Sequence, residues 1–439
     1  MALSAPGMTA RADPPAASRD PLVWCWVIAA AFLALLLHRL TIPSKPYFDE
    51  IHYLPAARTL LELSQVKNPE HPMLGKELMA LSMRFLGDNP LGWRLPSALA
   101  GAVALFAATR AVWWASLSRA ATLFAAVLLA TNFMTFVIAR IAMLDPYMLA
   151  FAMLALWFAA RAVRRPEHAR RDLALTGLAL GLALASKWAV APVAMLFGLA
   201  FAATRLRALR TVPGRWLTGR DTEPIRGISL LEAALWLGVV PMLVYFATFL
   251  PMALFAKGGV PVSGIPGFQL RMLALQESVI KPHPYQSEWW QWVLDLRPIW
   301  FLYEAIDGAQ RGVLMVGNPL VMWAGLAALI ACLVLGWRRR DPAMLGVVAL
   351  YAASLGMWII APKPVQFYYH YLLPGTFLTI ALALILAAMW DRGGSWRWPV
   401  MATLAPSATL FAWFYPILSS ARLPGPQAFL TYTWLDSWR

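Results

Sequence analysis

The chain has 439 residues, of which 60% are hydrophobic and only 13% are charged, whereas a soluble globular domain has about 25% charged residues. This composition excludes a water-soluble globular protein and indicates a polytopic membrane protein, in which lipid covers much of the apolar surface. The net charge of +15 would suit a nucleic-acid-binding protein, but its distribution along the chain argues against that class.

Eleven apolar runs are interpreted as membrane spans, so the predicted fold class is an all-α polytopic membrane protein. They lie near residues 22–40, 96–115, 120–138, 143–162, 173–186, 188–204, 229–250, 316–336, 344–361, 368–389 and 398–418. The first run is too long for the hydrophobic region of a signal peptide and no small-residue cleavage site follows it, so we expect a permanent anchor. The tail before it, 1–21, is rich in Ala, Pro and Arg and is expected to be disordered.

Lysine and arginine are unevenly shared between the two sets of loops. With the N-terminus in the cytoplasm, the cytoplasmic segments hold 20 of the 37 Lys and Arg residues but only 9 of the 22 Asp and Glu residues, counting Glu232 with them. Short cytoplasmic loops are enriched in Lys and Arg, so this orientation is the predicted one. It makes 1–21 a cytoplasmic tail, 22–418 the transmembrane domain and 419–439 an outer C-terminal tail. The excess charge then reflects topology, and we expect no nucleic-acid partner.

Two long segments, 41–95 and 251–315, fall on the outer side. In the first, residues 50–64 and 73–86 have helical apolar spacing but are too short to span, so we expect interfacial helices. Pro55 should kink or restart the first of them. The second segment contains QSEWWQWVLDLRPIWFLY, whose four tryptophans suggest another interfacial stretch. The two cysteines, which both lie in apolar runs, cannot form a disulfide framework or a thiolate metal site.

An acidic pair, Asp49 and Glu50, stands just beyond the first apolar run, in the sequence PYFDEIHY. Carboxylates are costly to place where a span meets water, and they indicate function there. Transfer of a sugar to a hydroxyl needs a carboxylate that accepts the hydroxyl proton, and this position is close to both a lipid-borne donor and a watery acceptor. The alternative interpretation is the N-terminus of an interfacial helix, where acids are also favoured.

Further polar side chains gather at the predicted outer ends of the spans. His71 and Lys76, in HPMLGK, could hold a phosphate or orient an acceptor. A His-Pro helix start with a snorkelling lysine explains them as well. The turn ARIAMLDPY carries Arg140 and Asp145. An arginine there suits a phosphate, and an Arg–Asp pair that closes the hairpin is the alternative.

Lys187, in ASKWAV, lies between two apolar runs with almost no loop. A lysine in this position needs a partner such as a lipid phosphate or pyrophosphate, and snorkelling is the alternative. His370 and Tyr369, in VQFYYHYLLP, could contact a sugar or a phosphate, although an aromatic belt explains the tyrosines of this motif equally well. Salt bridges within the first outer loop are the interpretation for three further residues, Arg58, Arg94 and Glu77.

Taken together, these motifs resemble the protein O-mannosyltransferase family, the polyprenyl-phosphate-mannose–protein mannosyltransferases of glycosyltransferase family 39. The family pattern has Asp-Glu in the first outer loop, then HPPLGK-like and R-x-x-x-L-D elements. It continues with a Lys-Trp after the fifth span, GNP at the start of a late span, and an end similar to Tyr-His-Tyr-x-x-Pro. From Tyr47 to Pro374 this chain has, in the same order, FDEIHY, HPMLGK, ARIAMLD, SKWAV, YQSEWWQW with RPIW, GNPLVMW and YYHYLLP. No single motif is specific, but the ordered set is.

The resemblance implies a GT-C fold and an inverting transfer of mannose from a polyprenyl-phosphate lipid to Ser or Thr hydroxyls of translocated proteins, at the outer face of a bacterial inner membrane. It implies Asp49 as the base, Glu50 as its neighbour in acceptor binding, and Arg140 and Lys187 as ligands of the donor phosphate. The resemblance suggests no required cofactor, although the acidic pair could bind a divalent metal. The supporting residues that it implies are His71 and His370, and our further candidates for a supporting or substrate-binding role are Lys76, Asp145 and Tyr369.

The chain departs from the family pattern in two places. The segment 251–315 is too short for the large soluble domain of fungal and animal members, as in bacterial members, and Met73 replaces the second Pro of HPPLGK. Aminoarabinose transferases share the fold and carry an acidic first-loop residue, so a transferase that modifies lipid A or another glycolipid is the alternative enzyme. The alternative outside enzymes is a transporter, which would place ionisable residues near the middle of the membrane and often has repeated halves.

Overall fold

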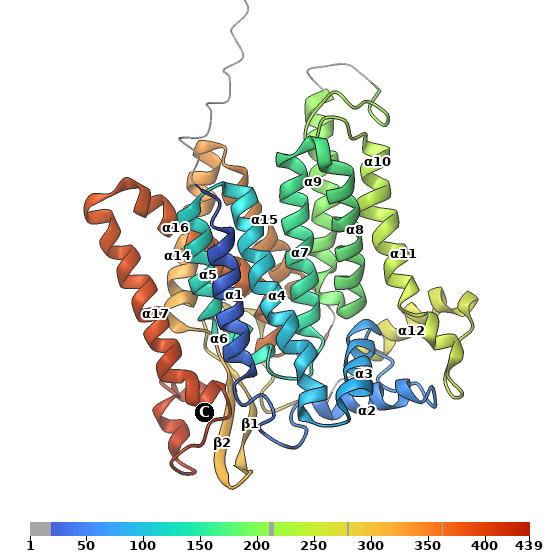
Figure 1. Cartoon of the computed structure of the whole chain (residues 1–439), viewed down its shortest axis with the longest axis vertical. Coiled ribbons are helices and arrows are strands. Elements are labelled where there is room, and N and C mark those ends of the chain that lie inside the picture. The colour runs from blue at the N-terminus through green and yellow to red at the C-terminus, as the bar shows by residue number, and fades with distance from the viewer. Residues whose placement is uncertain (1–18, 210–214, 279–280, 362) are drawn as a thin grey trace, which may run out of the picture.

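Long apolar helices lie side by side in a bundle, and short helices, a β-hairpin and the C-terminal segment gather at one end of it (Figure 1). The computed structural model describes residues 19–209, 215–278, 281–361 and 363–439, so the predicted disordered tail lies almost wholly outside the described residues. The start of α1 and the C-terminus lie at opposite ends of the bundle. We call the end that carries Asp49 the Asp49 end, and the other the arginine end.

Each predicted apolar run coincides with one or more helices. The helices of the bundle are α1 (Leu22–Leu37), α4 (Pro90–Ser116), α5 (Arg119–Ala130), α6 (Phe133–Ile138), α7 (Asp145–Arg164), α8 (Ala169–Ser186), α9 (Ala191–Leu209), α10 (Leu230–Ala234), α11 (Val240–Ala247), α14 (Pro319–Arg339), α15 (Pro342–Ile360), α16 (Leu372–Arg392) and α17 (Arg397–Leu418). The short helices at the Asp49 end are α2 (Glu50–Leu61), α3 (Leu74–Leu86), α12 (Ile265–Glu277) and α13 (Trp289–Val293).

Eight helical segments of the described chain are long and apolar enough to cross a membrane. The other predicted spans fall on α1, on α5 with α6, and on α8, which are shorter or less apolar, so the count of eleven stays a prediction, as does the orientation. The most apolar stretches of α4 and α16 are the best enclosed by other helices, which places these two helices in the interior of the bundle. Both cysteines are free and buried, in agreement with the sequence analysis.

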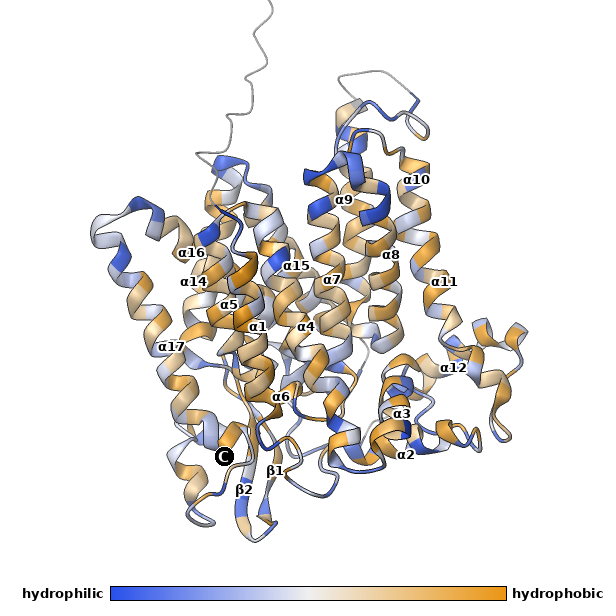
Figure 2. Cartoon of the chain, in the orientation of Figure 1, coloured by the Kyte–Doolittle hydropathy of each residue, from blue (hydrophilic) through white to orange (hydrophobic). Residues whose placement is uncertain are grey.

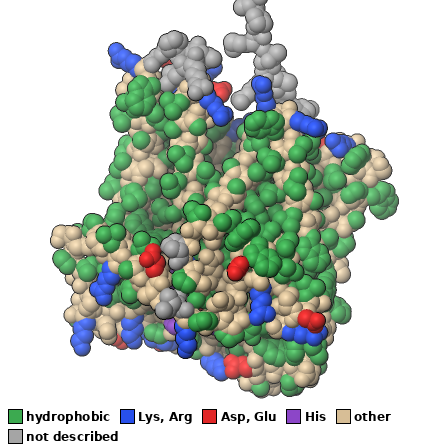
Figure 3. Space-filling model, turned by 180° about the vertical axis from the view of Figure 1, so that it is seen from behind, with side chains coloured by type: hydrophobic (Ala, Val, Ile, Leu, Met, Phe, Trp, Pro, Cys, Tyr) green, Lys and Arg blue, Asp and Glu red, His purple; other side chains and the backbone are tan. Residues whose placement is uncertain are grey.

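The distribution of polarity fits a membrane protein. Hydrophobic residues cover the middle of the helices, and hydrophilic residues concentrate towards the two ends (Figure 2). Seen from behind, the surface between the ends is mostly hydrophobic, while Lys and Arg lie mainly near the ends (Figure 3). Exposed apolar side chains in the middle band, such as Leu199 and Ile330, are costly in water but stable against lipid.

A β-hairpin lies in the second outer segment, where the sequence analysis predicted only helical or irregular structure. β1 (Ile299–Ile306) pairs antiparallel with β2 (Ala309–Met315). The two residues between them, Asp307 and Gly308, both have positive φ, which is the geometry of the tightest hairpin turns. The hairpin is exposed to view at the Asp49 end and lies beside the C-terminal segment (Figure 1).

The tryptophan-rich stretch is only partly interfacial. Trp289 and Trp290 are exposed, but Trp292 is fully buried and donates its indole N–H to the hydroxyl of Ser287. The prediction of an interfacial segment is therefore wrong for Trp292, because that ring packs into the core of the Asp49 end.

The first outer segment forms the two amphipathic helices that were predicted, α2 and α3. The helix does not restart at Pro55, because α2 continues through this residue, and the alternative of a kink there stays a prediction. Pro55 lies in the second turn, so the helix loses only one backbone hydrogen bond there. The hydroxyl of Thr59 donates to the carbonyl of Pro55 and ties the next turn to it.

Candidate active site

Asp49 directly precedes α2, and the backbone before it is strained. Phe48 has a φ of +49°, a conformation that a bulky residue adopts only where its surroundings enforce it. Its ring stacks on Phe301 of β1, with centroids 3.9 Å apart, and meets the edge of Tyr369 at 5.8 Å. Phe301 and the short helix η6 (Tyr368–Tyr371) thus hold the segment that presents Asp49.

Several charges act on the Asp49 carboxylate. Burial raises the pKa of Asp49 from its ordinary 3.8 to about 6, and Asp145 adds to the rise, while Lys187, His52 and Lys363 oppose it. These groups therefore lie within electrostatic range of Asp49 although they come from separate parts of the chain. A carboxylate whose pKa lies near the working pH is a better general base than an ordinary one.

Lys187 and Asp145 form a buried ion pair beside Asp49. The ammonium Nζ of Lys187 donates to both Asp145 oxygens at 2.8 Å, and it lies 5.0 Å from the centre of the Tyr369 ring. Asp145 begins α7, and Lys187 stands in the break between α8 and the next turn. The structure therefore gives Lys187 a partner. It also contradicts the two alternatives, an Arg140–Asp145 pair and a snorkelling Lys187.

Glu50 points away from solvent and into an ion pair with Arg94. The two side chains are fully buried, and Arg94 donates to both Glu50 oxygens at 2.8 Å. Glu50 also accepts backbone N–H bonds from Ala142 and Tyr47. Arg94 also donates to the carbonyl oxygens of Leu40, at the end of the first apolar run, and of Pro43 and Lys45 in the first outer segment. The pair thus joins the first outer segment, α4 and the turn before α7.

Two of the three predicted salt bridges of the first outer segment are present. Besides the Arg94 pair, Arg58 donates to Asp88 at 2.7 and 3.0 Å. Glu77 has no ion pair within the described ranges, and its Oε1 is buried without a hydrogen-bond partner there. Burial raises the pKa of Glu77 to about 7.

Arg140 closes the end of α1. Its guanidinium donates to the carbonyls of Leu36, His38 and Arg39, which follow or belong to the last turn of that helix. Helix ends leave carbonyl oxygens without partners, and a cation satisfies them. Burial lowers the pKa of Arg140 to about 10, so the group keeps its charge at neutral pH. Its predicted contact with a phosphate stays a prediction.

Lys76 shapes the loop that carries His71. Its Nζ is buried and donates to the carbonyls of Asn68 and His71, both at 2.8 Å, so the snorkelling alternative is wrong. The His71 ring meets the edge of Tyr53 at 5.8 Å. Burial lowers the pKa of His71 well below its usual value, with Lys187 and other cations adding to the effect, so His71 is neutral at pH 7.

His370 lies against aromatic rings. Its Nδ1 accepts the backbone N–H of Phe367 at 3.0 Å, and its ring stacks on Trp358 at 3.9 Å. Within the described chain its Nε2 is buried and has no hydrogen-bond partner. The tyrosines beside His370 are all buried, which contradicts an aromatic belt facing the lipid.

Two charged residues of this region were missed by the sequence analysis, Lys363 and Asp295. Lys363 stands in the short connection between α15 and η6, and its position seven residues before His370 at a span start was the available signal. Asp295 is fully buried and accepts from the hydroxyl of Tyr368 at 2.5 Å and from the N–H of Gly317 at 3.1 Å. Nothing in the local sequence distinguishes Asp295 from a surface acid.

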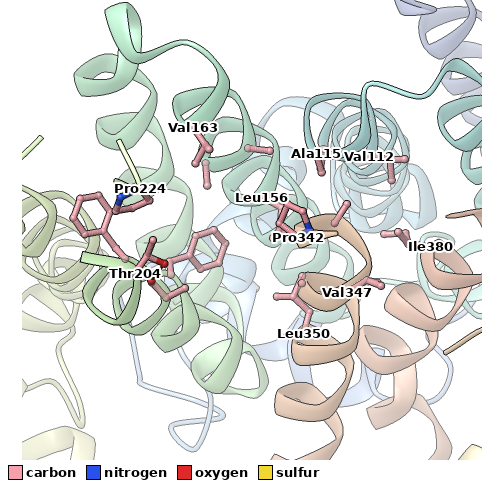
Figure 4. Close-up of a pocket in the computed structure, with 18 of the residues that line it drawn as sticks. Val112, Ala115, Leu156, Val163, Thr204, Pro224, Pro342, Val347, Leu350 and Ile380 are labelled. Carbon is pink, nitrogen blue, oxygen red and sulfur yellow. Dashed lines mark hydrogen bonds between the residues drawn. The ribbon is translucent and has the colours of Figure 1, made fainter. Parts of the chain in front are cut away.

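Side chains from several helices line an apolar cavity of about 420 Å³ (Figure 4). Its lining includes Ala115 and Val163 near the ends of α4 and α7 and Pro342 at the start of α15, so it lies at the arginine end, far along the helices from Asp49. Helices α4, α7, α9, α15 and α16 line it, with residues such as Leu156, Val163 and Leu350. α9 begins four residues after Lys187, and α15 ends three residues before Lys363. These two helices therefore connect the cavity with the polar groups at the other end.

No group of three or more His, Cys, Asp or Glu side chains is close enough to hold a metal ion in the part of the chain that the structure describes. The Glu50 oxygens are already engaged by Arg94 and two backbone N–H groups. The expectation that no cofactor is required stays a prediction.

Comparisons with known proteins point to one family. The profile of the dolichyl-phosphate-mannose-protein mannosyltransferase family matches residues 85–254, and that of the C-terminal four-span region of protein O-mannosyltransferases matches 264–438. The polyprenol-phosphate-mannose–protein mannosyltransferase of Mycolicibacterium smegmatis is 30% identical over 90% of this chain and 88% of its own length. The protein of the same name from Mycobacterium tuberculosis is 29% identical over 94% of this chain and 90% of its own length.

Solved structures show the same architecture. The Saccharomyces cerevisiae Pmt1-Pmt2 complex bound to the sugar donor superposes with a TM-score of 0.76 at 14% identity, over 94% of this chain and 92% of that chain. ArnT from Cupriavidus metallidurans bound to undecaprenyl phosphate gives 0.55 at 16% identity, over 89% of this chain and 64% of that chain. These likenesses show the GT-C fold that was predicted. With the sequence relatives, they lead to one conclusion: the chain belongs to the protein O-mannosyltransferase family of multi-span membrane glycosyltransferases.

Proposed function

We propose that this chain transfers mannose from a polyprenyl-phosphate-mannose lipid to a Ser or Thr hydroxyl of a protein at the outer face of a bacterial inner membrane. The observation that carries the proposal is the grouping of Asp49 with the Lys187–Asp145 pair and Tyr369 at one end of a GT-C bundle. The donor and the protein acceptor are those in the names of relatives that cover most of this chain.

In this mechanism Asp49 accepts the proton of the acceptor hydroxyl while its oxygen attacks the anomeric carbon. The bond from that carbon to the donor phosphate oxygen breaks, and attack from the opposite side inverts the configuration. With a pKa of about 6, Asp49 is mostly ionised at pH 7 and can take the proton. The lipid leaves as a phosphate monoester, so the leaving group needs no general acid.

Lys187 supports the reaction by stabilising the negative charge that grows on the leaving phosphate. Its ion pair with Asp145 holds Nζ beside Tyr369 before any substrate is bound, so little reorganisation is needed. The contacts of Glu50 and Arg140 support positioning roles: Glu50 holds the first outer segment against α4, and Arg140 fixes the end of α1.

The apolar cavity supports a lipid-borne donor. Its lining is almost wholly hydrocarbon, with Thr204 as the one polar side chain among the residues that line it. Thr204 lies 13 residues into α9, a rise of about 20 Å. A polyprenyl chain whose phosphate lies near Lys187 could therefore run along α9 and α15 into this cavity.

The acceptor class is tested by giving the purified chain, in nanodiscs, radiolabelled polyprenyl-phosphate-mannose with either a Ser/Thr-rich peptide or lipid A. We expect the label and a hexose mass increment on the peptide. Label on lipid A alone would contradict the proposal and favour the glycolipid-modifying alternative.

The pH dependence of the reaction should report the Asp49 carboxylate. Its pKa is raised in the folded protein, so the base is present above about pH 6 and is lost as the pH falls through that value. We expect kcat/KM for peptide mannosylation to be level near pH 7 and to fall about tenfold per unit below pH 6. A profile level down to pH 4.5 would contradict Asp49 as the base.

Removal of the Phe301 ring, which stacks on Phe48, should disturb the position of Asp49 while leaving the Asp49 side chain itself unchanged. In a Phe301→Ala variant, the stack at 3.9 Å is lost and Phe48 is no longer held in its strained conformation. We expect kcat to fall by roughly ten- to a hundredfold and the acid limb of the pH profile to move below pH 6, because water reaches Asp49. A Phe301→Leu variant keeps most of the side-chain volume, so its kcat and its acid limb should lie between those of the parent protein and those of Phe301→Ala. An unchanged acid limb in Phe301→Ala would contradict the positioning role.

A further inference from the structure

We propose that Lys363 is a second cationic ligand of the donor phosphate and acts together with Lys187 and the Nε2–H of His370. The ligand is the phosphate group of a polyprenyl phosphate ester. The inference rests on the proposed function for the identity of the donor, and it adds a residue that neither the family motifs nor the sequence relatives assign.

Lys363 has a fixed backbone and an unpaired ammonium group. The side-chain amide of Gln366 donates to the carbonyls of Trp358 and Lys363 at 3.2 and 3.3 Å, and the Gln366 carbonyl accepts the N–H of Ser287 at 2.9 Å. These bonds tie the backbone of Lys363 and Gln366 to the last turn of α15 and to Ser287. Within the described ranges, no hydrogen bond or ion pair engages the Nζ of Lys363. The side chain is half-buried, so this charge lacks both full hydration and a partner.

The charges around Lys363 belong to the candidate active site. Burial and the neighbouring charge of Lys187 lower the pKa of Lys363 to about 8, although Asp49, Asp145 and Glu70 oppose the shift. Two cations that approach each other raise the free energy unless an anion lies near both. Asp145 is already engaged by Lys187, and Asp49 has to accept the acceptor proton in the proposed mechanism. A phosphate is therefore the ligand that we infer for the second cation.

His370 contributes a donor of the same kind. Because its Nδ1 accepts the backbone N–H of Phe367, the neutral ring carries its proton on Nε2, and this buried N–H has no partner among the described residues. A buried N–H without an acceptor keeps its desolvation penalty, which an acceptor oxygen of the phosphate would offset. The His370 and Tyr369 ring centroids are 4.5 Å apart, and Lys187 lies over Tyr369. Lys187 and His370 therefore both lie against the Tyr369 ring, which is six residues beyond Lys363 in the chain.

The guanidinium of Arg140, by contrast, is not free to bind a phosphate. Its N–H groups donate to carbonyls at the end of α1, and a phosphate could bind them only by displacing those bonds. Lys363 thus offers a cation without a bonded partner among the described residues, which the motif-based prediction had placed in the turn before α7.

The test is binding of undecaprenyl phosphate, the lipid product of the reaction class, to the full chain in nanodiscs by native mass spectrometry, together with donor KM. We expect Lys363→Ala to weaken binding and raise KM at least tenfold, with kcat changed less than threefold. His370→Gln should weaken binding severalfold. Lys363→Arg should stay within threefold of the parent protein, and the exposed Lys67→Ala is the matched control with no effect. Unchanged affinity and KM in Lys363→Ala, with Lys363→Gln in agreement, would overturn the inference.

Inorganic phosphate distinguishes a lipid headgroup from a free anion. We expect Lys363→Ala to reduce the affinity for undecaprenyl phosphate, with millimolar inorganic phosphate competing only weakly. If the variant lost affinity for inorganic phosphate but not for the lipid, the site would bind a free anion and the lipid assignment would be wrong.

A pH series adds a readout that a purely structural role would not change. Above pH 7.5 a phosphate monoester is already doubly charged, because its second pKa is about 6. Lys363 loses its proton near pH 8 in the free protein, so lipid affinity should fall between pH 7.5 and 9. In Lys363→Arg the guanidinium stays charged, and affinity should remain level. Parallel curves for the two proteins would contradict the inference.

The failures of this inference and of the proposed function can be told apart. A parent protein that transfers no mannose but binds undecaprenyl phosphate in a Lys363-dependent way would contradict the function and leave the phosphate site. Normal mannose transfer that does not depend on Lys363 would contradict the phosphate site and leave the proposed function.

Discussion

Asp49→Asn is expected to abolish most mannose transfer, with kcat reduced about 100- to 10,000-fold, the usual contribution of a positioned general base. Asparagine keeps the size of the side chain and cannot accept the hydroxyl proton. Since no ion pair engages the Asp49 side chain among the described residues, its replacement removes the base without breaking a salt bridge. The measurement is single-turnover transfer of mannose to a Ser/Thr peptide in nanodiscs.

A matched control separates catalysis from surface charge. Asp436→Asn makes the same chemical change at an exposed position of the outer tail, and we expect parental rates. Undecaprenyl phosphate should bind Asp49→Asn with parental affinity or slightly better, because a negative charge has been removed. Parental turnover in Asp49→Asn would eliminate this residue as the base, even if every other part of the proposal held.

The second large effect is expected from the buried pair of Glu50 and Arg94. Glu50→Ala leaves the Arg94 guanidinium buried without its carboxylate, and breaking such a pair costs roughly 3–5 kcal/mol in the free energy of unfolding. Both side chains are fully buried, so water cannot replace the lost partner. Unfolding in mixed micelles measures the change, and Arg58→Ala is the control. It breaks an exposed pair with Asp88, worth about 0–1 kcal/mol.

Glu50→Gln separates stability from a direct part in acceptor binding. Glutamine keeps the shape and one acceptor oxygen, so we expect a smaller loss of stability and a largely retained kcat when the protein is folded. A folded Glu50→Gln variant with a parental donor KM and a strongly raised peptide KM would instead support the predicted contact of Glu50 with the acceptor. Equal loss of stability in Glu50→Ala and Arg58→Ala would contradict the importance of the buried pair.

The first outer segment shows how much of the structure local sequence patterns could predict. Its two amphipathic helices were predictable because apolar spacing shows in the sequence, and the continuous passage through Pro55 was not. Asp49 and Glu50 were both predicted to be site residues because they are adjacent carboxylates where a span meets water, a position in which a charge is costly. Their separation into a half-buried carboxylate within the field of Lys187 and a buried partner of Arg94 depends on where α4 and α8 lie.

By itself, the sequence determined that this is a helical membrane protein, where its apolar runs lie, and which family its ordered motifs resemble. These properties are local: a span needs about 20 apolar residues in succession, and each motif is a short string. The tertiary structure alone decided which charges meet. Lys187 pairs with Asp145, 42 residues away, and Arg94 with Glu50, 44 residues away.

The same reason explains the β-hairpin, the capping role of Arg140 and the position of Lys363. Each depends on contacts between elements that are far apart in the chain: Phe48 with Phe301, Arg140 with the end of α1, and Lys363 with the charges around Asp49. A charged residue in a low-dielectric site is stable only with suitable neighbours. Local sequence patterns do not predict which residues those neighbours are.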